Sequence, residues 1–286
     1  MSRVAIATCA GEDVDPDSRP LLAALRAQRL DGELARWDDP SVDWDQFDLV
    51  VVRSTWDYAP RRSEFLAWAK SVARLENPYA AIAFSSDKHY LGVLASRGHR
   101  VVSSFFCDVG VAAAFPGGDF VVKPSVGAGS LDAERYGAHD VERAARHVAR
   151  LHEQGRDVLI QPYVTSVDEL GERALVFIDG SFSHAMTKGA MLNVVVPDRH
   201  ALFRREQMSL ADAETDAVAF AQAVLDDFDF GGLLYARVDL VRVSEGWALM
   251  ELELVEPSLF LTHVPSAATA LATAIARRLA EGVATP

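Results

Sequence analysis

The sequence predicts an α/β domain at the start of the chain and an α+β region after it. Apolar strand candidates at residues 3–8 and 48–53 flank a helix candidate, which indicates a parallel sheet covered by helices. Much later, two strand candidates that alternate polar and apolar residues meet at Ser244-Glu245-Gly246, which favours a hairpin. Together these observations predict a mixed fold, α/β and α+β.

Length and composition narrow the class of protein. With 286 residues, 50% hydrophobic and 24% charged, the chain has room for one large domain or roughly two to three smaller ones. The net charge of −13 argues against general nucleic-acid binding, which needs a basic surface. No apolar stretch approaches the roughly 20 residues of a membrane span, and Cys9 and Cys107 have no metal-ligand spacing. We expect a cytoplasmic protein with free thiols. Its oligomeric state, a homo-oligomer included, stays open.

The amino-terminal region alternates between strands and helices. In order, we expect a strand at residues 3–8, a helix at 21–29 opened by Pro20, strands at 33–37 and 48–53, and a helix at 62–74. This order is typical of a parallel sheet with helices on its faces.

A polar and aromatic hexapeptide follows the strand at 48–53. It consists of Arg53, Ser54, Thr55, Trp56, Asp57 and Tyr58. Parallel sheets bind ligands outside the carboxyl ends of their strands, so the hexapeptide is a candidate substrate site. A turn and helix cap, with Trp56 and Tyr58 packed on the helix, would explain the same residues. Both interpretations stay open.

The rest of the chain contains further helix and strand candidates. One helix follows residues 84–88, has Ser85 or Ser86 as its cap, and ends near Gly98. We expect strands at residues 119–124, 157–164, 172–179 and 181–188. We expect further helices at 140–153 and 211–228, and a final helix that ends near Leu279. Asp179-Gly180 predicts a tight hairpin turn. Residues 190–208 lack a clean period and are expected to form a long loop.

Two lysines and a glycine-rich loop are candidates for phosphate binding. Lys123 ends a strand candidate and precedes a loop with Gly127, Gly129 and Ser130, whose backbone N–H groups could approach phosphate oxygens. The loop fits neither the Walker A nor the GxGxxG template, and a simple turn would also explain it. Lys88 lies in a first helical turn, where a cation is mildly unfavourable unless it faces a ligand.

The strand at 157–164 is a candidate for contact with a planar ring. Pro162 ends its regular pairing, so backbone groups next to Gln161 and Tyr163 are available for a heterocycle. The next two strand candidates carry Arg173 and Lys188.

The hairpin at 235–257 concentrates charge. Arg237 and Asp239 share one face of its first strand, and Glu251 and Glu253 share one face of its second. Carboxylates packed together repel unless a cation neutralises them. Their oxygen ligands suit Mg²⁺, or Mn²⁺ in its place, with phosphates completing the coordination. A solvated acidic face is the alternative.

These features together resemble the ATP-grasp superfamily, nearest to its glutathione synthetase-like carboxylate–amine ligases. The residues that carry the resemblance are Lys88, Lys123 with its glycine loop, Gln161-Pro162-Tyr163, Arg173, Lys188, Arg237-x-Asp239 and Glu251-x-Glu253. The resemblance covers roughly residues 85–260 and implies an ATP-grasp fold after a parallel βαβ domain. It implies a division into residues 1–84, a central subdomain at 85–160 and a carboxy-terminal subdomain at 161–286. Within the superfamily, the chain is most similar to the cycloserine synthetases, which are O-ureidoserine cyclo-ligases.

The resemblance also implies roles for individual residues. ATP would contact Lys88, Lys123, Gly127, Gly129, Ser130, Gln161 and Tyr163, with Asp168 or Glu169 at the ribose. Mg²⁺ would bind Asp239, Glu251 and Glu253, while Arg237 and Lys188 would be catalytic. The amino-acid-like substrate would contact the hexapeptide and Ser258. Such ligases usually have asparagine where this chain has Glu253, and Glu256 is near, so the third metal ligand stays open.

The implied reaction is activation of a substrate carboxylate by ATP as an acyl phosphate, followed by attack of an amine. In the cycloserine-like interpretation the amine is internal, and O-ureido-D-serine closes to D-cycloserine. An intermolecular amino-acid or peptide ligase is the main alternative, and a small-molecule kinase is another. A catalytically silent nucleotide-binding module is disfavoured by the presence of Lys123, Asp239 and Glu251.

Overall fold

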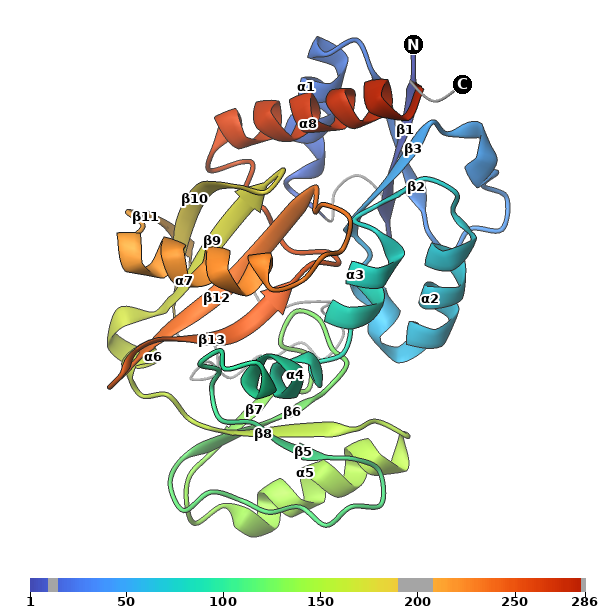
Figure 1. Ribbon diagram of the computed structural model, residues 1–286. Coiled ribbons are helices and arrows are strands. Elements are labelled where there is room, and N and C mark those ends of the chain that lie inside the picture. Colours follow the sequence, from blue (N-terminus) through green and yellow to red (C-terminus); the bar gives the residue numbers. More distant parts are fainter. Residues whose placement is uncertain (10–14, 190–207, 284–286) are drawn as a thin grey trace.

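Three β-sheets organise the protein, as a computed structural model shows (Figure 1). The structure describes residues 1–9, 15–189 and 208–283. The sheets follow one another along the chain, in the order of the three predicted segments. The division at residues 84 and 160 stays a prediction. No helix in the described residues is both long and apolar enough to cross a membrane.

The first sheet is parallel, as the sequence predicts. Its strands are β1 (Arg3–Thr8), β2 (Asp31–Arg36), β3 (Leu49–Ser54) and β4 (Leu75–Glu76), in the order β2-β1-β3-β4. The apolar runs of β1 and β3 are buried because helices cover the sheet. The helices of this region are α1 (Ser18–Ala27) and α2 (Arg62–Ser71). α1 begins three residues before the predicted start, so Pro20 lies within its first turn.

The segment after β4 departs from the prediction in part. The helix predicted after residues 84–88 is α4 (Tyr90–Ser96), whereas α3 (Tyr79–Ser85), which precedes it, was not predicted. Ser85 does not cap a helix, because its hydroxyl donates a hydrogen bond to the carbonyl of Leu252 at 2.8 Å. The hydroxyl of Ser86 likewise donates to the carbonyl of Ala83. The break between α3 and α4 places Lys88 outside both helices.

The second sheet is antiparallel and carries the glycine loop. It consists of β5 (Phe105–Cys107), β6 (Phe120–Pro124), β7 (Glu134–Tyr136) and β8 (Val158–Pro162), in the order β5-β8-β6-β7. Helix α5 (Val141–Glu153) packs on it (Figure 1). The glycine loop connects β6 to β7. The two three-residue strands, β5 and β7, were not predicted.

The third sheet is also antiparallel. Its strands are β9 (Glu172–Ile178), β10 (Ser181–Lys188), β11 (Met208–Ala211), β12 (Tyr235–Val243) and β13 (Gly246–Glu253), in the order β11-β10-β9-β12-β13. Helix α6 (Ser166–Leu170) precedes β9, and α7 (Thr215–Asp226) precedes β12. The predicted turn at Asp179-Gly180 is confirmed, since both residues have positive φ. Most of the predicted long loop, residues 190–207, lies outside the described residues.

The carboxy-terminal helix returns to the start of the chain. Helix α8 (Pro265–Val283) packs along α1 (Figure 1), and Leu271 and Ile275 share a buried cluster with Leu21 and Leu25. The side chain of Asn77 adds a polar connection, because its Nδ2 donates to the carbonyls of Tyr235 and Leu254, each at 2.8 Å. The first sheet is thereby fixed against the strand β12 and the segment that follows β13.

Candidate active site

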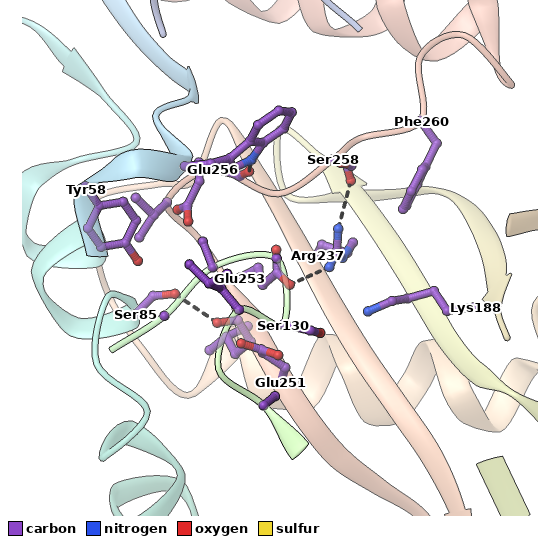
Figure 2. Close-up of a pocket in the computed structure, with 18 of the residues that line it drawn as sticks. Tyr58, Ser85, Ser130, Lys188, Arg237, Glu251, Glu253, Glu256, Ser258 and Phe260 are labelled. Carbon is purple, nitrogen blue, oxygen red and sulfur yellow. Dashed lines mark hydrogen bonds and ion pairs between the residues drawn. The ribbon is translucent and has the colours of Figure 1, made fainter. Parts of the chain in front are cut away.

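A cavity of about 520 Å³ lies where the three sheets meet (Figure 2). Its wall combines residues of all three regions. The predicted residues that line it are Trp56, Tyr58, Lys88, Lys123, Gly127, Gly129, Ser130, Lys188, Arg237, Glu251, Glu253 and Ser258. Residues far apart in sequence thus converge on one space, with cations and carboxylates facing each other.

The acidic hairpin has the arrangement that its alternation predicts. In the register of β12 and β13, Arg237 lies opposite Glu253 and Asp239 lies opposite Glu251. All four side chains therefore share one face. The guanidinium of Arg237 contacts the carboxylate of Glu253 (Figure 2).

Asp239 lies at the centre of the charges and below the cavity wall. It has no exposed surface. Its carboxylate accepts hydrogen bonds from Arg237 Nε at 2.9 Å and from Lys188 Nζ at 2.8 Å. Burial alone would raise the pKa of Asp239, but Arg237 and Lys188 lower it. Both carboxylate oxygens are therefore engaged by cations.

Lys88 joins the hairpin to the glycine loop. Its ammonium lies 2.9 Å from Glu251 Oε1 and donates to the carbonyl of Gly127, also at 2.9 Å. Burial opposes the charge of Lys88, but the carboxylates of Glu251, Glu253 and Glu256 together outweigh burial, and the pKa of Lys88 is raised. Burial would raise the pKa of Glu251, but the positive charges of Lys88, Lys123 and Lys188 lower it to about 2.

Lys123 differs from the other cations of the cavity. It lies on β6 and is partly buried, and its ammonium has no ion-pair partner among the described residues. Burial, together with the positive charge of Lys88, lowers the pKa of Lys123. A cation in this state would be stabilised by an anionic ligand.

The loop after β6 has the conformation that its composition allows. Gly129 has a φ of 60°, in the region that favours glycine, and Ser130 follows with a φ of 56°. Two successive residues with positive φ turn the chain sharply at this point. Gly127, Gly129 and Ser130 all line the cavity. The loop therefore faces the same space as Lys88 and Lys123.

Two carboxylates of the cavity hold protons more tightly than usual. Burial raises the pKa of Glu253 to about 7, although Arg237 opposes that shift. Burial, with the charge of Glu253 as the next cause, raises the pKa of Glu256 to about 8. Arg237 divides its hydrogen bonds between Asp239 and Glu253, and so it neutralises Glu253 only in part.

The hexapeptide divides between the cavity and the core. Trp56 and Tyr58 line the cavity. Arg53 is buried away from it, donating through Nη2 to the carbonyl of Pro257 at 2.6 Å with its guanidinium over the ring of Tyr235. The Ser54 hydroxyl donates to Thr8, and the hydroxyl of Thr55 is buried. Asp57 accepts from Trp37 at 2.8 Å and from Arg61 at 2.7 Å. The structural interpretation therefore fits these four residues better than substrate contact does.

The residues predicted at the base and ribose lie outside the cavity wall. Gln161 is buried on β8, and its Nε2 donates to the hydroxyl of Ser104 at 2.9 Å. The Tyr163 hydroxyl donates to Asp168 at 2.6 Å, and Arg135 lies over the Tyr163 ring. Asp168 and Glu169 belong to α6. Their nucleotide contacts stay predictions.

Sequence reasoning missed several residues that line the cavity, among them the polar residues Asp17 and Ser85. Asp17 accepts hydrogen bonds from the backbone N–H of Leu259 at 2.9 Å and of Thr262 at 3.3 Å, so it shapes the loop before α8. Ser85 lines the cavity beside β13. The local sequence carries no signal for Asp17, because the contact forms only when a distant segment returns.

The cavity has the type of ligand atoms that a magnesium ion prefers, but these atoms are not arranged around one point. Its carboxylates offer only oxygen ligands, as Mg²⁺ prefers. No three acidic, histidine or cysteine side chains of the described residues are already grouped around a common point. Lys88 holds Glu251, while Arg237 and Lys188 hold Asp239. The predicted ligands Asp239, Glu251 and Glu253 thus lie together, but cations occupy them.

Comparisons with known proteins identify the family. A family model described as the N-terminal domain of D-cycloserine synthetase DcsG matches residues 4–77. The chain is 40% identical to the cycloserine biosynthesis protein DcsG of Streptomyces lavendulae, over 93% of this chain and 95% of that protein. Both matches agree with the resemblance that the sequence motifs indicate.

Solved structures agree with the sequence comparison. The crystal structure of D-cycloserine synthetase DcsG matches with a TM-score of 0.86 and 37% identity, covering 97% of this chain and 100% of that one. A D-alanine–D-alanine ligase from Bacillus anthracis, complexed with ATP, matches with a TM-score of 0.70 at 12% identity, covering 98% of each chain, and shares the fold. The predicted ATP-grasp fold and ligase class are thereby confirmed. The chain belongs to the D-cycloserine synthetase family of ATP-grasp ligases.

Proposed function

We propose that the protein is an ATP-dependent cyclo-ligase that converts O-ureido-D-serine to D-cycloserine. The observation that carries the proposal is the arrangement of the cavity in a chain 40% identical to DcsG. Lysines and a glycine loop face carboxylates and Arg237 across one enclosed space. Such a space could hold the phosphates of ATP next to a small carboxylate substrate.

The phosphates would lie beside the cationic side of the cavity. Lys123 has no ion-pair partner among the residues that the structure describes, so an anionic phosphate would relieve the cost of its buried charge. Lys88 already touches the loop at Gly127 and could hold that loop over the phosphates. Backbone N–H groups of Gly129 and Ser130 would add donors. Gln161 and Tyr163 would contact the base, and Asp168 or Glu169 the ribose.

The chemistry requires a good leaving group on the substrate carboxyl. Transfer of the γ-phosphoryl group of ATP to the carboxylate supplies one, because phosphate leaves an acyl centre readily where oxide does not. Arg237 and Lys188 are our candidates for neutralising the charge on the transferring group. Positioning of the two reactants would supply the rest of the rate enhancement.

Ring closure would then use an amine within the same molecule. The ureido nitrogen next to oxygen attacks the acyl phosphate, the phosphate leaves, and loss of the carbamoyl group releases carbon dioxide and ammonia. Since ATP becomes ADP and phosphate with one water consumed, the atoms balance. Walls formed by Trp56, Tyr58 and Phe260 would keep water from the acyl phosphate.

Magnesium would bind on the carboxylate side. Glu251 and Glu253 line the cavity, and Asp239 lies directly below them. When bound, Mg²⁺ would neutralise phosphate charge and orient the phosphates. Mn²⁺ has similar ligand preferences and could replace it.

An ADP-release assay tests the proposal. Purified protein with ATP and Mg²⁺ should release ADP on addition of O-ureido-D-serine alone and form D-cycloserine, detected by mass spectrometry. An intermolecular ligase would instead need a second amine. A kinase would form a phosphate ester that hydroxylamine does not attack, whereas hydroxylamine would trap an acyl phosphate. Absence of D-cycloserine under conditions that support ADP release would refute the cyclisation.

A further inference from the structure

Glu256 lines the cavity with a carboxyl group to which no described residue donates a hydrogen bond. The other acidic side chains of the cavity all have donors, namely Lys88 for Glu251, Arg237 for Glu253, and two backbone N–H groups for Asp17. The carboxylate of Glu256 has no hydrogen-bond or ion-pair partner in the part of the chain that the structure describes. It is partly buried, so water compensates it only in part.

The backbone holds Glu256 firmly at this place. Trp56 Nε1 donates to the carbonyl oxygen of Glu256 at 3.0 Å. The next carbonyl, that of Pro257, accepts from Arg53 Nη2 at 2.6 Å. Arg53 at the end of β3 and Trp56 just after it therefore anchor consecutive peptide units. The anchoring fixes the backbone of Glu256, whose side chain lies on the Tyr58 side of the pocket, with Lys188 on the other side (Figure 2).

The electrostatic state of Glu256 favours a cationic ligand. Burial first, and the charge of Glu253 second, raise the pKa of Glu256 to about 8, although the charges of Lys88 and Arg237 oppose this shift. ATP and a substrate carboxylate are both anionic and would increase this cost. An ammonium group would relieve it, because an opposite charge at hydrogen-bond distance stabilises the ionised carboxylate.

An α-amino acid carries its two charges on one carbon, so its site needs a cation and a carboxylate close together. Arg237 and Glu256 both line the cavity, and Figure 2 shows Glu253 between them, in contact with Arg237. We propose that Glu256 binds the α-ammonium of the amino-acid substrate and selects amino acids over acids that lack this group. The inference rests on the proposed function, because it assumes that the carboxyl next to Arg237 is the one activated.

The test pairs an amino acid with its counterpart that lacks the ammonium. The probes are O-ureido-D-serine and 3-(ureidooxy)propanoate, and a second pair is D-alanine and propanoate. Wild-type protein, Glu256→Gln and the matched control Glu245→Gln are compared by ADP release and by calorimetric binding. Glu245 lies exposed in the turn between β12 and β13, away from the cavity.

We expect Glu256→Gln to lower kcat/KM for the amino acid by about 30-fold or more, because a charged pair in a buried site is lost. The KM for ATP and the use of the desamino acid should stay within about twofold. Glu245→Gln should match the wild type throughout. If wild-type protein does not prefer an amino acid to its desamino counterpart, or if Glu256→Gln weakens both equally, the assignment is wrong.

Two further outcomes distinguish ammonium binding from metal binding and from failure of the cyclisation. A higher Mg²⁺ requirement in Glu256→Gln, with unchanged discrimination between the paired acids, would make Glu256 a metal ligand and overturn the proposal. If wild-type protein uses D-alanine and ignores O-ureido-D-serine, the proposed cyclisation fails. The ammonium assignment would then be decided by the D-alanine and propanoate pair.

Discussion

The carboxylate of Asp239 is bound by the guanidinium of Arg237, two residues away on the same strand, at 2.9 and 3.1 Å. Strand alternation puts both side chains on one face, and complete burial makes each dependent on the other. The sequence suggested Asp239 mainly as a metal ligand. Its position indicates that it also neutralises two cations, Arg237 and Lys188, before any ligand binds.

Replacing Asp239 by asparagine should therefore impair stability as well as Mg²⁺-dependent ATP turnover. Loss of the carboxylate removes the counter-charge that two buried cations share, and leaves Lys188 with Glu172 and Arg237 with Glu253, at a cost of about 3 kcal/mol. Urea unfolding should show this loss, and ADP release should fall to background. The matched control is Asp226→Asn on the outer surface of α7. Undiminished turnover by a folded Asp239→Asn protein would remove Asp239 from the metal site.

Replacing Lys123 by alanine should weaken ATP binding with little effect on the amino-acid substrate. A hydrogen bond to a charged group contributes about 1.5–3 kcal/mol, which corresponds to at least about a tenfold rise in the ATP dissociation constant. Calorimetric titration with a non-hydrolysable ATP analogue measures it. The exposed Lys70→Ala serves as the control. Unchanged affinity would contradict the placement of the phosphates.

Trp56 should matter more for the amino-acid substrate than for ATP. Trp56→Phe keeps an aromatic ring but removes the N–H that anchors the carbonyl of Glu256. We expect the KM for the amino acid to rise severalfold, and Trp56→Ala to have a larger effect, with the KM for ATP unchanged. Trp44→Phe, away from the cavity, is the control. Equal changes in the KM values for ATP and for the amino acid would indicate that Trp56 has only a structural role.

Gly171→Ala should destabilise the fold beside Lys188. The glycine has a φ of +68°, and an added Cβ would lie 2.5 Å from the carbonyl oxygen of Lys188. Gly155 has a similar φ of +71° but open space around it, so Gly155→Ala measures the cost of a positive φ without a close contact, about 1 kcal/mol. The ψ of Gly171, −175°, lies in a region that essentially only glycine adopts, which adds to the cost at that position. Thermal unfolding should show a greater loss for Gly171→Ala. Equal losses would mean that the neighbouring strand moves aside without cost.

Acidification should destabilise the protein partly through His147. Burial, with Arg150 as the next cause, lowers the pKa of His147 from its usual 6.5, and its buried Nε2 has no hydrogen-bond partner among the described residues. The unfolded chain binds a proton near pH 6.5 and the folded protein does not, so stability falls as the pH drops below 6.5. His147→Gln should reduce this slope by up to about 1.4 kcal/mol per pH unit. The exposed His139→Gln should leave it unchanged.

The parts of the site that depend on local periodicity could be predicted from the sequence. Alternation placed Arg237 with Asp239 on one face and Glu251 with Glu253 on one face, because a strand turns its side chains over every second residue, and the register of the hairpin then brings the two faces together. The glycine loop was likewise identifiable, because its composition suits residues with positive φ.

The parts that depend on tertiary contacts could not be predicted. Asp17 reaches the cavity because the chain returns to it more than 240 residues later. Arg53 looked like a ligand cation, but only the folded structure supplies the carbonyl of Pro257 as its partner. The strands β5 and β7 are three residues long, too short for a period to be read.

The ion pairs of the cavity make ligand binding an exchange of partners. A phosphate that draws Lys88 away from Glu251 leaves that carboxylate available to a divalent cation. Nucleotide and metal would consequently bind with positive cooperativity, each raising the affinity for the other by the same factor. The apo protein would bind Mg²⁺ weakly by itself, since its own lysines already serve as counterions.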